Sequence, residues 1–129
     1  MKLSKRILAA GLTILLGVTQ ASAAGLSPVG SWQSAGGETR YHVTLCGDGT
    51  ELCAKLTWLR SDLRTPENLR YLNAYVLKGA HQAKPDTWTG TIIFNGETHS
   101  GSVRLVGPDN IELKGCTLGL CKSVEFTRI

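Results

Sequence analysis

The chain has 129 residues, with 14 Lys and Arg against 10 Asp and Glu. This length allows one small domain and excludes a two-domain enzyme or a (β/α)8 barrel. Three of the basic residues lie in the first six positions and residues 1–23 contain no acid, so the remainder is nearly neutral and we expect no nucleic-acid partner.

Residues 1–23 have the pattern of a secretory signal peptide. A basic segment, residues 1–6, precedes an apolar stretch, residues 7–18, and the small-residue site Ala21-Ser22-Ala23 follows. The apolar stretch is shorter than the roughly 20 residues of a membrane span. We therefore expect cleavage after Ala23, one domain over residues 24–129 with no membrane span, and a periplasmic or secreted location.

The rest of the chain predicts β-strands throughout, because apolar and polar side chains alternate with a period of two and turn residues separate the runs. The predicted strands cover residues 30–34, 38–46, 52–59, 74–79, 87–94, 97–106, 110–116 and 121–128. Residues 66–73 could form a short helix, and residues 79–86, with His81, are predicted as a loop.

Eight antiparallel strands joined by short turns satisfy their edges best by closing on themselves. We predict an all-β fold, a small eight-stranded antiparallel up-and-down barrel, whose lumen is wide enough for side chains or one small ligand. Alternation points five rings inward: Tyr41, Trp58, Trp88, Phe94 and Phe126. These rings would fill much of the lumen, so we expect any pocket to lie at a mouth of the barrel.

The four cysteines are expected in an oxidising compartment, where an even number predicts disulfides. Three pairings are possible, and the spacing favours Cys46 with Cys53 and Cys116 with Cys121, because each pair flanks a turn and each cysteine alternates to the outer face. A zinc site is less favoured, since neither pair has C-x2-C spacing or a matching His.

The sequence contains no recognisable catalytic motif. His42, His81 and His99 are the only side chains suited to acid–base chemistry at neutral pH, and none belongs to a zinc-protease or hydrolase signature. We expect no enzyme, no catalytic residue, no metal and no cofactor.

The longest connection, residues 60–73, is long enough to carry function. It has two equal interpretations: a lid with solvated charges, or a binding segment whose residues to test are Arg64, Arg70 and Tyr71.

Gly30-Ser31-Trp32 opens the first strand and Thr127-Arg128 closes the last. This combination resembles the signature of the calycins, which include the lipocalins. The resemblance implies that Trp32 packs under Arg128 and seals one end of a lipocalin-like barrel. Alternation supports it, because Arg128 shares the inward face of Phe126. The alternative is an ordinary core Trp32 and a solvated Arg128.

A narrower resemblance, from about Val29 to Arg128, is to the exported bacterial family of domain of unknown function 2147. The matching motifs are Gly30-x-Trp32, Cys46-Gly47-Asp48-Gly49 with Leu52-Cys53, Trp88-x-Gly90, Gly115-Cys116 with Cys121, and Thr127-Arg128. The chain departs from the family pattern at residues 94–99 and at Phe126. The resemblance implies export and a lipocalin-like barrel, but no biochemical role.

Two functions fit these observations. The first is a small apolar or amphipathic ligand bound between Trp58, Trp88, Tyr75 and the long connection. The alternative is a periplasmic interaction factor or inhibitor that binds another protein through residues 60–73, with its barrel filled by side chains.

Overall fold

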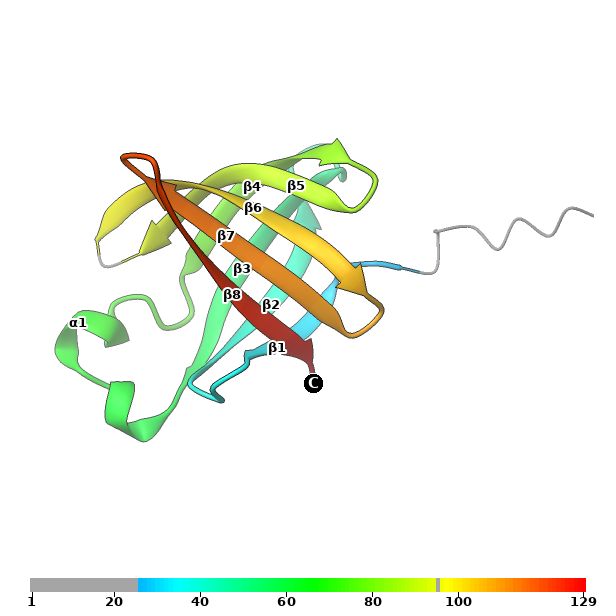
Figure 1. Ribbon diagram of the computed structural model, residues 1–129. Coiled ribbons are helices and arrows are strands. Elements are labelled where there is room, and N and C mark those ends of the chain that lie inside the picture. Colours follow the sequence, from blue (N-terminus) through cyan, green and yellow to red (C-terminus); the bar gives the residue numbers. More distant parts are fainter. Residues whose placement is uncertain (1–25, 95) are drawn as a thin grey trace, which may run out of the picture.

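Eight antiparallel strands form a closed barrel in the computed structural model, which describes residues 26–94 and 96–129 (Figure 1). The strands are β1 (Gly30–Ser34), β2 (Thr39–Cys46), β3 (Glu51–Leu59), β4 (Tyr75–Lys84), β5 (Thr87–Phe94), β6 (Glu97–Gly107), β7 (Asn110–Thr117) and β8 (Leu120–Arg128). Each strand pairs with its neighbours in the sequence, and β8 returns to pair with β1. The predicted all-β up-and-down barrel is confirmed; the expected leader and its cleavage site lie outside the described residues.

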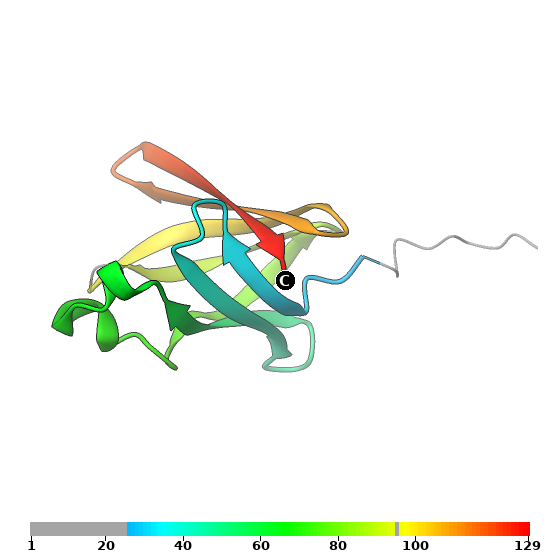
Figure 2. The same cartoon turned by 90° about the horizontal axis from the view of Figure 1, so that it is seen from below.

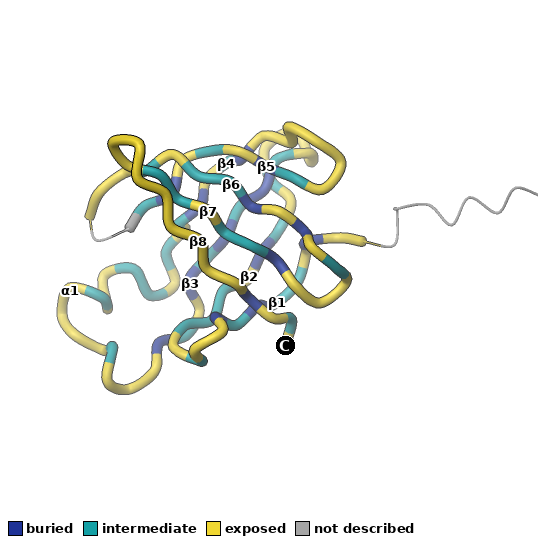
Figure 3. The backbone as a smooth tube through the Cα atoms, viewed as in Figure 1, coloured by how far each residue is buried: buried dark blue, intermediate teal, exposed yellow. Residues whose placement is uncertain are grey.

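The lumen is packed with side chains, because the inward positions of all eight strands carry mainly apolar residues. Trp32 and Leu52 are fully buried, and the Tyr41 ring meets Phe126 edge to face with 5.4 Å between their centroids. Every strand has buried positions (Figure 3), and the buried cluster comprises Trp32, Val43, Leu52, Ala54, Leu77, Ala80, Trp88, Ile92, Val103, Leu105, Ile111 and Phe126. A deep internal site would have to displace this packing.

Strand β4 is longer than predicted, and His81 lies within it rather than in a loop. Residues 81–84 pair with the start of β5, although all four are exposed. Their own side chains lie in solvent, although Gln82 pairs with the buried Trp88 on β5. Such a segment has no apolar alternation, so its sequence is indistinguishable from that of a polar loop.

The inward prediction for Trp58 is wrong because β3 contains a β-bulge. Arg40 pairs with Trp58, but the next residue, Tyr41, pairs with Leu56, so one residue of β3 is skipped. A one-residue shift moves every following side chain to the other face. Leu59 is therefore buried, and Trp58 turns to the outside. The Phe94 side chain lies outside the description.

The barrel has two distinct ends (Figures 1 and 2). The end we call the N-terminal mouth comprises residues 26–29, the turns at 47–50, 85–86 and 108–109, and the end of β8. The opposite end, the loop end, comprises the turns at 35–38 and 118–119, Gly96 and the connection 60–74. This connection contains one 3-10 turn, Ser61–Leu63, and the short helix α1 (Pro66–Leu69), within the predicted helical stretch. None of the helices formed by the described residues is long and apolar enough to span a membrane.

Candidate functional site

Two residues from opposite ends of the chain fasten the N-terminal mouth. The Arg128 guanidinium lies 4.3 Å over the centroid of the Trp32 ring, which is the stacked pair expected from the sequence. Arg128 also donates hydrogen bonds to the carbonyls of Ser27 (2.6 Å) and Val29 (2.7 Å), and Trp32 Nε1 donates to Pro28 (2.8 Å). The pair therefore holds residues 27–29 across the mouth.

Gly30 makes this arrangement sterically possible. A Cβ added there would lie 2.6 Å from the Arg128 guanidinium, and the φ of Gly30, 141°, is one that other residues rarely adopt. The glycine of the G-x-W motif thus lets the arginine side chain pass over the backbone.

The fastened segment forms one wall of a hollow of about 300 Å³. The hollow is lined by Leu26, Ser27, Pro28, Leu45, Gly49, Thr50, Gln82, Pro85 and Trp88. None of these side chains is charged. A volume of this size is at the lower end of the range for small-molecule sites, about 300–1,000 Å³. The site accordingly lies at a mouth of the barrel, where the sequence predicted a pocket.

Trp88 is the chemically distinctive residue of this lining. Its side chain is 5% exposed, and its indole Nε1 has no hydrogen-bond partner among the described residues. A buried donor without a partner costs about 1–3 kcal/mol. Most buried donors in native proteins are satisfied by protein or by water, so the Trp88 indole stands out among the buried polar groups of the described residues.

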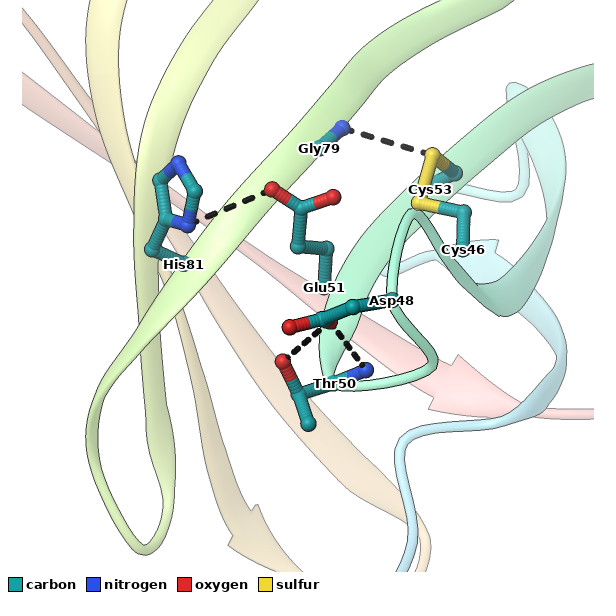
Figure 4. Close-up of a disulfide and its surroundings, with 7 residues drawn as sticks. All are labelled: Cys46, Asp48, Thr50, Glu51, Cys53, Gly79 and His81. Atoms are coloured by element: carbon teal, nitrogen blue, oxygen red, sulfur yellow. Dashed lines mark hydrogen bonds and ion pairs between the residues drawn. A yellow bond between two sulfur atoms is a disulfide. The ribbon is translucent and has the colours of Figure 1, made fainter.

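The β2–β3 hairpin supplies the facing wall and is braced in two ways (Figure 4). The disulfide Cys46–Cys53 joins its strands with a Cα–Cα distance of 6.0 Å. Asp48 accepts hydrogen bonds from the backbone N–H (2.9 Å) and the hydroxyl (2.6 Å) of Thr50. These two bonds lower the pKa of Asp48 below its ordinary value and fix the turn that carries Thr50.

A second contact ties this hairpin to β4. Glu51 Oε1 lies 3.3 Å from His81 Nδ1, and the Gly79 N–H donates to Cys53 Sγ at 3.3 Å (Figure 4). The predicted local pairing of the cysteines holds at both ends of the barrel, since Cys116 and Cys121 form the second disulfide. Among the described residues, no cluster of His, Cys, Asp and Glu could hold a metal ion.

The aromatic residues proposed around the ligand do not form a single site. Tyr75 is exposed and carries Lys55 Nζ 5.0 Å from its ring centroid, and the Trp58 ring is covered by the Arg40 guanidinium at 4.4 Å. Trp88 pairs with Gln82, seven residues along β4 from Tyr75, or roughly 20 Å at about 3.3 Å per residue. The predicted grouping of Trp58, Trp88 and Tyr75 is therefore wrong.

The remaining predicted residues lie at the loop end. Arg64 donates to the Leu59 carbonyl at 3.0 Å, and the exposed Arg70 follows helix α1. The Tyr71 hydroxyl lies beside Gly96, so the long connection reaches the β5–β6 turn. Of the predicted ligand-binding residues, only Trp88 lines the hollow at the N-terminal mouth.

Sequence reasoning missed the other lining residues for two reasons. Leu26, Ser27 and Pro28 precede the first strand, and only their bonds to Trp32 and Arg128 bring them over the mouth. Leu45 has the alternation of a core residue but is 49% exposed, because it lies where the barrel opens. The sequence feature that could have located residues 26–28 is the Gly30-x-Trp32 motif that directly follows them.

Comparisons with solved structures show the fold. A Helicobacter pylori protein, HP1028, described as belonging to the lipocalin family, superimposes with a TM-score of 0.58 at 13% identity, over 81% of this chain and 84% of that one. A redesigned β-barrel gives a TM-score of 0.50 at 17% identity, over 83% of this chain and 93% of the other. No curated protein matches the sequence.

A family model described as "Uncharacterized protein conserved in bacteria (DUF2147)" matches residues 30–128. This match spans every strand of the barrel, from the Gly30-x-Trp32 motif to Arg128. The chain therefore belongs to this family of uncharacterised bacterial proteins, DUF2147, and has a lipocalin-like barrel.

Proposed function

We propose that the protein is an exported, periplasmic binding protein that takes one small, uncharged and mainly apolar molecule at the N-terminal mouth of its barrel. It acts by binding rather than by catalysis. The observation that carries the proposal is the 300 Å³ hollow lined by Trp88, whose buried indole N–H has no partner. The two disulfides and the leader expected over residues 1–23 support an oxidising compartment.

The lining determines the chemistry of the ligand. Apolar atoms of Leu26, Leu45 and the Trp88 ring favour an apolar body, and the absence of charged side chains in the lining disfavours an ion. The indole N–H would pair with one acceptor oxygen, such as that of a ketone, ester or alcohol. Such ligands are only weakly amphipathic, because they carry one polar atom on an apolar skeleton.

A fluorescent probe of this class tests the proposal. Prodan has a naphthalene body and one ketone oxygen, and its emission moves to shorter wavelength when it leaves water. Titrated into the chain 24–129, it should give a saturable shift with one site. Trp88→Phe keeps an aromatic ring but removes the N–H, and should weaken Prodan binding by about tenfold, the value of one hydrogen bond of about 1.4 kcal/mol.

Two controls separate this site from nonspecific binding. The carbonyl-free analogue 2-dimethylaminonaphthalene should bind wild type and Trp88→Phe equally. Trp58→Phe, on the outer face, should leave Prodan binding unchanged. A wild-type protein that gives no saturable shift, or an equal loss in both tryptophan variants, would refute binding at this mouth.

The alternative, protein recognition through residues 60–73, has weaker support. The connection satisfies its polar groups internally: Arg64 donates to Leu59, Asn68 Nδ2 donates to Leu63 at 2.9 Å, and Thr65 caps helix α1. A pull-down compared with the double variant Arg64→Ala, Arg70→Ala tests this alternative, which requires a partner that the variant loses.

A further inference from the structure

The tip of the β7–β8 hairpin is exposed (Figure 3), and its sequence carries two leucines, Leu118 and Leu120. Leu118 is 99% exposed and Leu120 78% exposed, and the turn stands at the edge of the molecule in both ribbon views (Figures 1 and 2). The strands beneath it reach past the core, since Val124 on the inward side of β8 is 45% exposed. The leucines therefore have no apolar surface of this chain to cover.

The turn itself gives no reason for a leucine. Leu118 and Gly119 have φ values of 51° and 80°, the conformation of a two-residue type I′ turn, which favours Asn-Gly. A Cβ makes the left-handed conformation unfavourable for Leu. The other hairpin turns use polar or glycine-rich sequences: 35–38, Gly47-Asp48-Gly49, Pro85-Asp86, Asn95-Gly96 and Pro108-Asp109. A leucine in this unfavourable conformation points to a use outside the turn.

The tip is held in a fixed shape. The disulfide Cys116–Cys121 joins the two strands with one residue pair, Thr117 and Leu120, between it and the turn, and with 4.1 Å between the Cα atoms. The ring of His99 on β6 bonds the hydroxyl of Thr117, which ties the hairpin to its neighbour. A braced tip presents its leucines without the entropy cost of ordering a mobile loop.

Two lysines lie near the tip. Lys114 and Lys122 are the charged residues of the stretch 113–124, and Glu112 and Glu125, which pair with each other, lie just beyond it. The nearest acid on the adjoining strand is Glu97, whose carboxylate lies 3.6 Å from His99 Nε2. Two exposed leucines flanked by two lysines fit the surface of a lipid bilayer, which has an apolar interior beneath a layer of negatively charged headgroups.

We propose that this hairpin tip, Leu118 with Leu120, inserts into the headgroup region of a bilayer that contains anionic phospholipid, while Lys114 and Lys122 contact the phosphates. A protein partner is less well matched, because a stable interface needs about 20–30 residues on each side, whereas a convex tip of two side chains needs no complementary surface in a bilayer. The tip lies at the loop end, so this contact is independent of the ligand hollow at the N-terminal mouth.

Vesicle flotation of the chain 24–129 tests the proposal. At low salt, the wild type should float with vesicles of phosphatidylethanolamine and phosphatidylglycerol, and less with phosphatidylcholine alone. The double variant Leu118→Asn, Leu120→Thr should lose at least about tenfold in partitioning. This variant will fold, because Asn-Gly suits the type I′ turn better than Leu-Gly. Lys114→Gln with Lys122→Gln should remove the preference for anionic vesicles.

Val106→Thr is the matched control, since Val106 is 45% exposed near the opposite end of the barrel and should not affect flotation. Equal flotation of wild type and the leucine variant would overturn the proposal, as would equal affinity for both vesicle types. Size-exclusion chromatography without vesicles tests whether the tip instead binds a second copy of the chain. A dimer that the leucine variant abolishes would assign the tip to a second copy of the chain and also overturn the membrane contact.

Discussion

Replacing Arg128 by Met should destabilise the barrel more than any other single change of a surface charge. Met retains most of the apolar stem but removes the guanidinium from the Trp32 ring. It also removes hydrogen bonds to the carbonyls of Ser27, Val29 and Pro108, at 2.6, 2.7 and 3.0 Å. Residues 27–29 and the turn between β6 and β7 therefore both lose the side chain that binds them.

The magnitude follows from these contacts. The stacked cation contributes about 1 kcal/mol. The three hydrogen bonds contribute about 2 kcal/mol together, reduced from their buried value because the Arg128 side chain is 28% exposed. The ion pair with Asp109, at 3.6 Å, adds little at such exposure. We expect a loss of about 3 kcal/mol, or a fall in Tm of roughly 12–24 °C for a domain of this size.

Urea unfolding followed by tryptophan fluorescence measures this loss. Arg104→Met is the matched control, because the Arg104 side chain is 51% exposed and its ion pair with Glu112, at 3.6 Å, is open to solvent, so its loss should cost less than about 0.5 kcal/mol. Arg128→Lys should recover only part of the stability, since an ammonium cannot span the separate carbonyls as a fork does. If Arg128→Met and Arg104→Met unfold at the same urea concentration, the closing role of Arg128 is refuted.

Three further results are expected. Cys116→Ser with Cys121→Ser should cost about 2 kcal/mol in urea unfolding, from the entropy of a six-residue loop, and no loss would contradict that model. Gly90→Ala should lower the free energy of unfolding by about 1–3 kcal/mol, because its Cβ would lie 2.9 Å from a Cα of β4. Gly115→Ala, which has open space around the added Cβ, should lower it by less than about 0.5 kcal/mol, and equal losses would refute the steric reason. Burial raises the pKa of Tyr41 above its ordinary value of about 10, so the unfolded state releases its proton first and stability should fall as the pH rises above about 10; Tyr41→Phe should flatten that fall in the urea midpoint, and an unchanged slope would contradict it.

The barrel could be predicted from the sequence because its determinants are local. Alternation along each strand and glycine-rich turns define eight strands, and the two cysteine pairs lie within single hairpins. The resemblance of Gly30-x-Trp32 with Arg128 to the calycin signature also implied which two distant residues meet, and alternation supported it by placing Arg128 on the inward face.

The positions of Trp58 and Tyr75 could not be predicted, because each depends on a bulge. A skipped residue in β3 turns Trp58 outward, and a shift between Ala54 and Lys55 pairs Lys55 with Tyr75 on the outer side. A bulge arises from pairing between strands, so it leaves no mark in the alternation of one strand.

An indole ¹⁵N–¹H correlation spectrum recorded during a Prodan titration tests the central claim most directly. The account predicts that the Trp88 Nε1–H resonance shifts on binding, together with the backbone amides of Leu45, Thr50 and Gln82, while the Trp58 indole stays in place. Shifts confined to Tyr71 and its neighbours at the loop end, or an unmoved Trp88 indole at saturation, would contradict a ligand site at the N-terminal mouth.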